Sequence, residues 1–158
     1  MRDSVKVLVM ALSLAGITCG SSSGGKDLSK FKGTWQPTTY MATITCGGTP
    51  DVVNTGDNIT WSGGVSTDLV QTDPTTNCVL DADVTGETAS AISGQTCTVH
   101  DSSGDNIVLN LPQYTFSLSA DGQTATEASS GTANVTFTDG TATVCQYSES
   151  ASYHKITS

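Results

Sequence analysis

The sequence predicts an all-β domain: an antiparallel up-and-down meander that closes into a small barrel or half-barrel and carries two disulfides. Three observations predict it. Apolar and polar residues alternate with period two from residue 33 onward, Asp-Gly pairs separate alternating segments, and four cysteines are spread over the same region. Because the edges of a long meander must be paired or covered, closure is the expected architecture.

The strands are predicted from this alternation and from the turns between them. In residues 114–118 and 133–137 every second residue is apolar and the residues between are polar. Asp121-Gly122 and Asp139-Gly140 each lie between two alternating segments, which is a strong signal for a hairpin. The predicted strands are 34–45, 57–62, 66–72, 77–85, 88–93, 95–100, 105–111, 113–120, 123–129, 131–138 and 141–156.

The apolar phase of these strands defines the expected interior. Aromatic residues make up only 6% of the chain, so the core is modest and covalent cross-links are expected to support it. The predicted interior residues are Trp35, Tyr40, Ile44, Ile59, Trp61, Leu80, Val99, Leu109, Phe116, Val135, Phe137 and Val144.

Four cysteines in the β region are expected to form two disulfides. In a closed meander the first and last strands meet, which favours Cys46–Cys145 together with Cys78–Cys97. The alternative joins Cys46 to Cys78 and Cys97 to Cys145. Each disulfide is expected to stabilise the fold by about 2–4 kcal/mol. The absence of a C-x-x-C pair argues against a zinc site.

The N-terminus predicts export and lipid attachment. Residues 1–18 combine early basic residues with a short apolar stretch, and residues 16–19 (GITC) resemble a bacterial lipobox. That resemblance implies a signal peptide at 1–18 and acylation of Cys19; an ordinary secretory signal is the alternative. A lipidated, Gly/Ser-rich tether is expected at 19–32 and the folded domain at 33–158. Because Gly20 is not Asp, the resemblance implies the outer membrane of a Gram-negative bacterium.

The charge balance excludes one class of partner and suggests another. The chain has 6 basic and 15 acidic residues, a net charge of −9, and Lys155 is the only Lys or Arg after residue 32. An acidic chain of this kind repels a phosphate backbone, so nucleic acid is not an expected partner. The acidic surface supports solubility, or attracts a cationic protein.

Catalytic and metal-binding patterns are weak. His100 and His154 are the only histidines, and although His100 is followed by acidic and hydroxyl residues, neighbours on a strand do not assemble a triad. Asp81 with Asp83, or the loop 101–106, offers oxygen ligands of the kind calcium takes, but Asp and Asn are also ordinary turn residues. We therefore expect no enzymatic activity, no cofactor and no metal.

One short motif resembles a known family. Gly33-Thr34-Trp35 is similar to the G-x-W that begins lipocalin barrels, in which the Trp closes the barrel floor and a basic residue near the C-terminus stacks on the indole. The resemblance implies that Lys155 contacts Trp35 and that the mouth of a small barrel holds an apolar ligand. The expected function is a non-catalytic envelope module that binds such a ligand or a partner. The alternative is an acidic inhibitor-type or structural surface lipoprotein, similar in architecture to bacterial lysozyme inhibitors.

Lipid attachment has a direct test. Cys19→Ser should abolish labelling of the protein by radioactive palmitate, because it removes the acylated thiol. A matched Cys46→Ser variant should keep the label. Label that persists in Cys19→Ser would contradict the lipobox interpretation.

Overall fold

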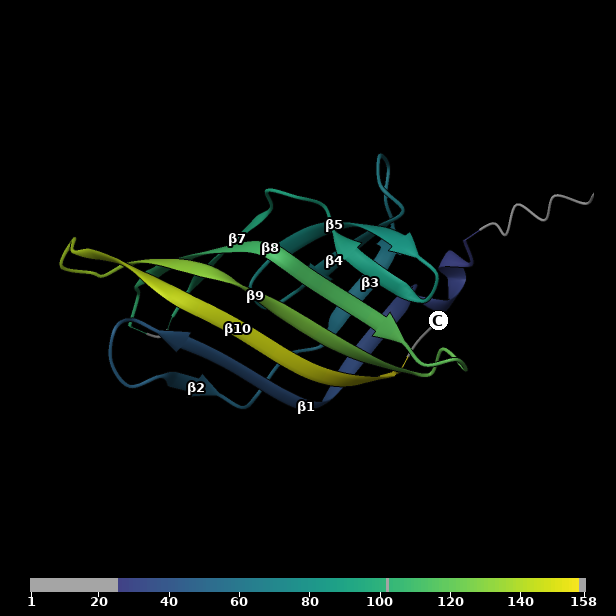
Figure 1. Ribbon diagram of the computed structural model, residues 1–158, viewed down its shortest axis with the longest axis horizontal. Helices are drawn as coiled ribbons and strands as arrows, with labels where there is room; N and C mark the ends of the chain where they lie inside the picture. The colour runs from purple at the N-terminus through teal and green to yellow at the C-terminus, as the bar shows by residue number, and fades with distance from the viewer. Residues whose placement is uncertain (1–25, 102, 157–158) are drawn as a thin grey trace, which may run out of the picture.

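The computed structural model describes residues 26–101 and 103–156, and the acylation site predicted at Cys19 lies outside these residues. The described chain consists of one short 3-10 helix, η1, and ten strands (Figure 1). Their bounds are η1 Leu28–Lys30, β1 Gly33–Thr45, β2 Asp51–Val53, β3 Ile59–Gly63, β4 Leu69–Asp73, β5 Cys78–Thr85, β6 Thr88–Ala91, β7 Thr96–His100, β8 Asn106–Leu118, β9 Thr124–Thr136 and β10 Ala142–Lys155.

The strands form a closed antiparallel barrel, as predicted. Eight strands follow one another around it in the order β1, β3, β4, β5, β6, β8, β9 and β10, and β10 then pairs with β1 to complete the circle. Figure 1 shows β10 lying between β9 and β1. The other two strands lie outside this circle: β2 pairs with the C-terminal part of β1, and β7 pairs with the N-terminal part of β8.

The long strands explain two differences from the predicted strand list. Segments 105–111 and 113–120 merge into β8, and 123–129 and 131–138 merge into β9. Pro112 looks like a break in the sequence, but it lies in a bulge where the register shifts between Asn110 and Gln113. Gly131 of β9 faces this bulge, and an added Cβ would overlap the backbone oxygen of Asn110. The short β2 was not predicted.

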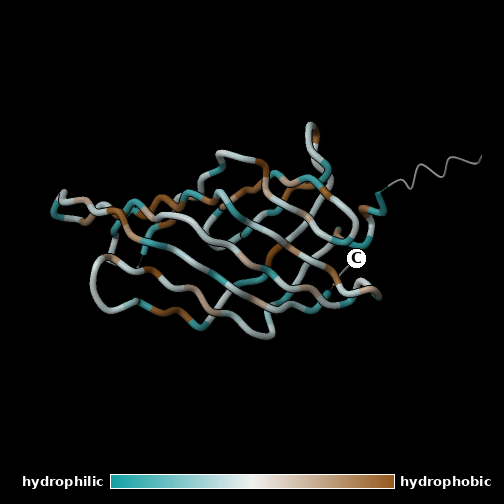
Figure 2. Tube along the Cα trace, in the orientation of Figure 1, coloured by the Kyte–Doolittle hydropathy of each residue, from teal (hydrophilic) through white to brown (hydrophobic). Residues whose placement is uncertain are grey.

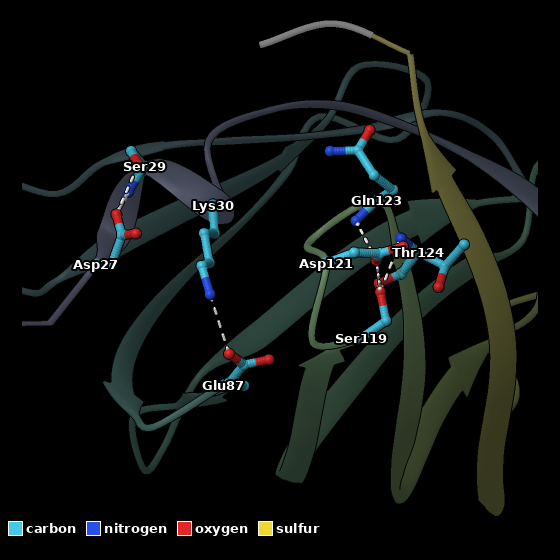
Figure 3. Close-up of polar contacts among 8 residues, drawn as sticks. All are labelled: Asp27, Ser29, Lys30, Glu87, Ser119, Asp121, Gln123 and Thr124. Atoms are coloured by element: carbon cyan, nitrogen blue, oxygen red, sulfur yellow. Dashed lines mark hydrogen bonds and ion pairs between the residues drawn. The ribbon is translucent and has the colours of Figure 1, made fainter.

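One end of the barrel is closed by η1. Asp27 caps this helix by accepting hydrogen bonds from the backbone N–H and the hydroxyl of Ser29 (Figure 3). Lys30 reaches across the end of the barrel to Glu87, in the β5–β6 turn, at 3.1 Å (Figure 3). Lys26 forms a second ion pair with Asp68, at 2.5 Å, in the loop before β4. The two ion pairs connect η1 and the residues before it to loops at this end of the barrel.

Trp35 forms the floor of this closed end. Its indole is fully buried, and its Nε1 donates a hydrogen bond of 2.8 Å to the backbone oxygen of Phe31, which is itself buried. The ammonium group of Lys155 lies 5.4 Å from the centre of the indole ring, which is within the range of a cation–π contact. The contact implied by the G-x-W resemblance is therefore present, and the core includes a residue that precedes Gly33.

Aromatic rings fill the interior above this floor. Phe116 is in edge contact with Trp35 at 5.2 Å between ring centres, and with Trp61 at 5.3 Å. Hydropathy changes from residue to residue along the strands rather than in long blocks (Figure 2), as expected for strands with one buried face. Of the predicted interior residues, seven are buried: Trp35, Ile59, Trp61, Leu80, Leu109, Phe116 and Val135.

Five predicted interior residues are less buried or are exposed. Tyr40, Ile44 and Val99 are partly buried and pack against the core. Phe137 and Val144 are exposed, and their assignment to the core was wrong. Phe137 follows the end of β9, in the hairpin that projects beyond the barrel in Figure 1. In β10 the inward face begins at Cys145, so its neighbour Val144 points outward.

Both disulfides have the favoured connectivity. Cys46, just after β1, is bonded to Cys145 of β10 across the closing strand pair, with a Cα–Cα distance of 4.3 Å. Cys78 of β5 is bonded to Cys97 of β7, with a Cα–Cα distance of 5.3 Å. The alternative connectivity is therefore excluded.

The bulge in β8 predicts a sensitive glycine. Gly131→Ala should lower the free energy of unfolding by about 1–3 kcal/mol, because the new Cβ must displace the backbone of the neighbouring strand. Gly48→Ala is the matched control, since an added Cβ there meets no atom within 4 Å. Urea unfolding of both variants measures the difference, and equal effects would contradict the packing argument.

Candidate ligand-binding cavity

The half of the barrel farther from η1 is hollow. It contains a cavity of about 400 Å³, which lies within the range of sites that hold small molecules. Its wall is formed by residues of β1, β3, β4, β5, β7, β8, β9 and β10, and the segment 53–57 and the β4–β5 turn complete it. At the mouth, β2 and β7 extend the rim beyond the ends of the short strands β3 to β6.

The cavity exists because small residues alternate with large ones across the four long strands. Pairing of β8, β9, β10 and β1 sets inward-facing side chains in register, in two adjacent rows. We call the deeper one the Glu127 row and the outer one the Glu149 row. The Glu127 row is Phe116, Glu127, Ala151 and Tyr40; the Glu149 row is Tyr114, Ser129, Glu149 and Ala42.

Each row places a carboxyl group beside small side chains. Glu127 has Ala151 as its neighbour on β10, and Glu149 has Ser129 and Ala42 on its two sides. The two glutamates are diagonal neighbours on β9 and β10, a spacing at which long side chains interact. The rows therefore combine open space with two converging acidic groups.

Glu127 is the most unusual of these residues. It occupies an inward position of β9, only 5% of its surface is exposed, and its Oε2 atom has no hydrogen-bond partner among the described residues. Burial in the first place, and then the charge of Glu149, raises the pKa of Glu127 well above its usual value. This shift favours the neutral form of the carboxyl group in the empty barrel.

All four tyrosines of the chain line the cavity: Tyr40, Tyr114, Tyr147 and Tyr153. Burial raises the pKa of each one, and repulsion by Glu127 or Glu149 in its ionised form is the next largest cause. Their hydroxyl groups consequently stay protonated and act as donors. The hydroxyl of Tyr147 donates to Oε2 of Glu149.

Other polar atoms of the wall are buried without a partner. The hydroxyls of Tyr114 and Ser129 and the Oε2 atom of Glu127 have no partner at hydrogen-bond geometry among the described residues, although Tyr114 and Tyr153 lie close enough to Glu127 to oppose the rise in its pKa. Each such group costs about 1–3 kcal/mol when it is left unpaired. Three of them in one cavity is a pattern expected of a site that binds polar atoms rather than of a core.

The segment before β3 covers one side of the cavity. Gly56 packs so closely on Tyr40 that an added Cβ would overlap the ring. A glycine is therefore required at this position to keep the segment against the tyrosine. Asp57, next in the chain, lies on the cavity wall.

The residues singled out from the sequence lie mostly around the mouth or outside the cavity. Cys78 and Cys97 line the wall, so their disulfide is part of the rim, and His100 lies beside it. His154 is on β10 but does not line the cavity, so the two histidines are not brought together there. The Cys46–Cys145 disulfide links the end of β1 to β10, just beyond the residues through which these two strands pair.

The candidate calcium ligands have other roles. Asp101 accepts hydrogen bonds from the backbone N–H groups of Ser103 and Asp105, and Asp105 accepts one from Thr138. Asp81 and Asp83 lie on the outer face of β5, where Asp81 accepts from the hydroxyl of Thr67. Within the described ranges, no group of three or more His, Cys, Asp or Glu side chains is arranged to hold a metal ion.

Sequence reasoning missed Glu127, Glu149 and the role of the tyrosines. A signal was present: Tyr147, Glu149, Ala151 and Tyr153 alternate with Ser and His, so a charged residue shares the aromatic face of β10. Glu127 likewise shares the face of Ala125 on β9. A charge in the buried phase of a strand is the feature that could have located the site.

Comparison with protein families, curated proteins and solved structures found no match. In the described part of the chain, no helix has the length and apolar character needed to span a membrane. The candidate site therefore depends on the geometry of the cavity itself.

The raised pKa of Glu127 predicts a pH-dependent stability. Above the ordinary glutamate pKa of about 4.3 the unfolded chain loses a proton that the folded chain keeps, so stability falls as the pH rises towards the folded pKa, by about 1.4 kcal/mol per pH unit. Glu127→Gln is neutral at every pH and should lose this slope, becoming more stable than the native chain at pH 7 and above.

Urea unfolding at several pH values from 5 to 8.5 measures this difference. Asp83→Asn, on the exposed outer face of β5, is the control and should keep the pH dependence of the native chain. Parallel curves for Glu127→Gln and the native chain would show that Glu127 is not held neutral.

Proposed function

We propose that this chain is a lipid-anchored, non-catalytic protein of the bacterial outer membrane whose barrel binds a small, largely apolar molecule in its hollow half. The observation that carries the proposal is the cavity of about 400 Å³. Most of its lining side chains are apolar or aromatic, and a few polar groups converge in it, which is the usual composition of small-molecule sites.

The uneven packing of the barrel interior supports ligand binding over a purely structural role. Near η1 the interior is filled by Trp35, Trp61 and Phe116. Farther away the wall holds three polar atoms without partners, which weaken the fold unless something pairs with them. A bound molecule with polar atoms would remove that cost.

The proposed anchor fits this arrangement. The acylated residue would be Cys19, seven residues before Lys26 and on the N-terminal side of η1, which covers the closed end of the barrel. The Gly/Ser-rich segment between them would act as a flexible tether. The mouth lies at the other end of the long strands, so it is free to receive a ligand.

Native mass spectrometry of the intact protein, extracted from membranes in mild detergent, tests the proposal. We expect a small molecule to remain bound, and a protein mass lower than that of the reduced chain by about four hydrogens, as two disulfides require. A protein that carries no non-covalently bound mass beyond its lipid anchor, even after exposure to an extract of envelope small molecules and lipids, would contradict ligand binding and would favour the acidic protein-binding alternative.

A further inference from the structure

Acidic side chains outnumber basic ones among the residues that line the cavity, where His100 is the only residue of a basic type. Four carboxyl groups belong to the lining, those of Asp57, Asp73, Glu127 and Glu149, and no lysine or arginine is among the lining residues. Lys155, the only basic residue after position 32, is held at the opposite end of the barrel, where its ammonium group donates to the backbone oxygen of Lys30 and lies over Trp35.

Two of these carboxyl groups already have partners. Asp73 accepts hydrogen bonds from the backbone N–H of Thr75 and from the backbone N–H and hydroxyl of Thr76, which stabilise the β4–β5 turn. Glu149 accepts one hydrogen bond from Tyr147. Glu127, deeper in the cavity, keeps an unpaired oxygen although it is 95% buried. In its neutral form this carboxyl group has one O–H donor as well as acceptor lone pairs, and in its ionised form it only accepts, so a cationic donor is the partner that suits the ionised form.

The aromatic residues of the cavity also favour a partner that carries positively charged donor groups. The four tyrosines line the same cavity as the two glutamates, and tyrosine ring faces attract cations, most strongly in sites that are shielded from water. A neutral apolar molecule would leave Glu127 unpaired, and an anion would meet the charge of Glu149.

Building on the proposed ligand-binding function, we propose that the molecule bound in the cavity is a small organic cation, an ammonium group on an apolar body. Its N–H groups donate to Glu127 and Glu149, and its apolar part packs against the tyrosines and the aliphatic wall. The positive charge offsets the burial and repulsion that favour neutral Glu127 in the empty barrel, so this carboxyl group ionises when the ammonium group binds and releases its proton to solvent. The acidic domain also attracts cations over longer distances.

Three probes with the same phenyl-alkyl body test the charge preference: 2-phenylethylamine, 2-phenylethanol and 3-phenylpropanoate. Their binding to the full-length protein in a non-ionic detergent is measured by calorimetry at neutral pH, with empty micelles as the background. We expect the amine to bind about 10- to 150-fold more tightly than the alcohol, the range that a hydrogen bond to a charged group supplies. The carboxylate should bind more weakly than either.

Glu127→Gln assigns the effect to the cavity. It should reduce the affinity for 2-phenylethylamine towards that of 2-phenylethanol, so that the ratio of the two affinities falls, and a cooperative urea unfolding transition shows that the variant is folded. Asp83→Asn removes an acidic group from the outer face of β5 and should change neither affinity, so it controls for the general charge of the domain.

The outcomes separate this inference from the function on which it rests. If the alcohol or the carboxylate binds as tightly as the amine, or if Glu127→Gln leaves the preference for the amine intact, the cation preference is wrong, whereas a small molecule retained in native mass spectrometry would still support a ligand-binding barrel. Failure of the amine to bind at millimolar concentration also overturns the inference. A chain that retains no molecule in the mass spectrum removes the underlying function as well.

Discussion

The pairing of β10 with β1 is the constraint on which the rest of the structure depends. It runs from Trp35 opposite Lys155 to Thr45 opposite Gln146, and it converts a meander with two open edges into a closed barrel. The Cys46–Cys145 bond lies just beyond the far end of this pairing. Closure creates an inside, and it fixes which side chains of the four long strands face one another across it.

The two halves of the closed barrel differ in how tightly their interiors are packed. At the end covered by η1, large aromatic rings fill the space; the indole N–H of Trp35 is hydrogen-bonded, whereas that of Trp61 has no partner among the described residues. In the other half the rows contain alanine and serine next to glutamate, so space remains and buried polar groups are left without partners. We interpret the packed half as the part that stabilises the fold and the open half as a binding site, because well-packed cores contain few cavities and few unpaired polar groups.

The fold was largely predictable from sequence and the site was not. Alternation and the Asp-Gly turns indicate the strands, and closure of a meander indicates which cysteines meet, because these are local signals combined with one topological rule. The bulge at Pro112 looked like a strand break, and Val144 was placed in the core through a phase error of one residue, since a one-residue shift reverses every side chain. Glu127 and Glu149 belong together only through the β9–β10 register, which sequence alone does not specify.

The burial and raised pKa of Glu127 predict a neutral group in a binding site rather than an ionised surface residue. Carbon-13 NMR of protein labelled at the glutamate carboxyl carbons tests this most directly, with the Glu127→Gln spectrum used for assignment. We predict that Glu127 gives the chemical shift of a protonated carboxyl group at neutral pH and moves to that of a carboxylate when 2-phenylethylamine is added. A Glu127 signal that is already that of a carboxylate in the empty protein, and is unchanged by the amine, would contradict the account.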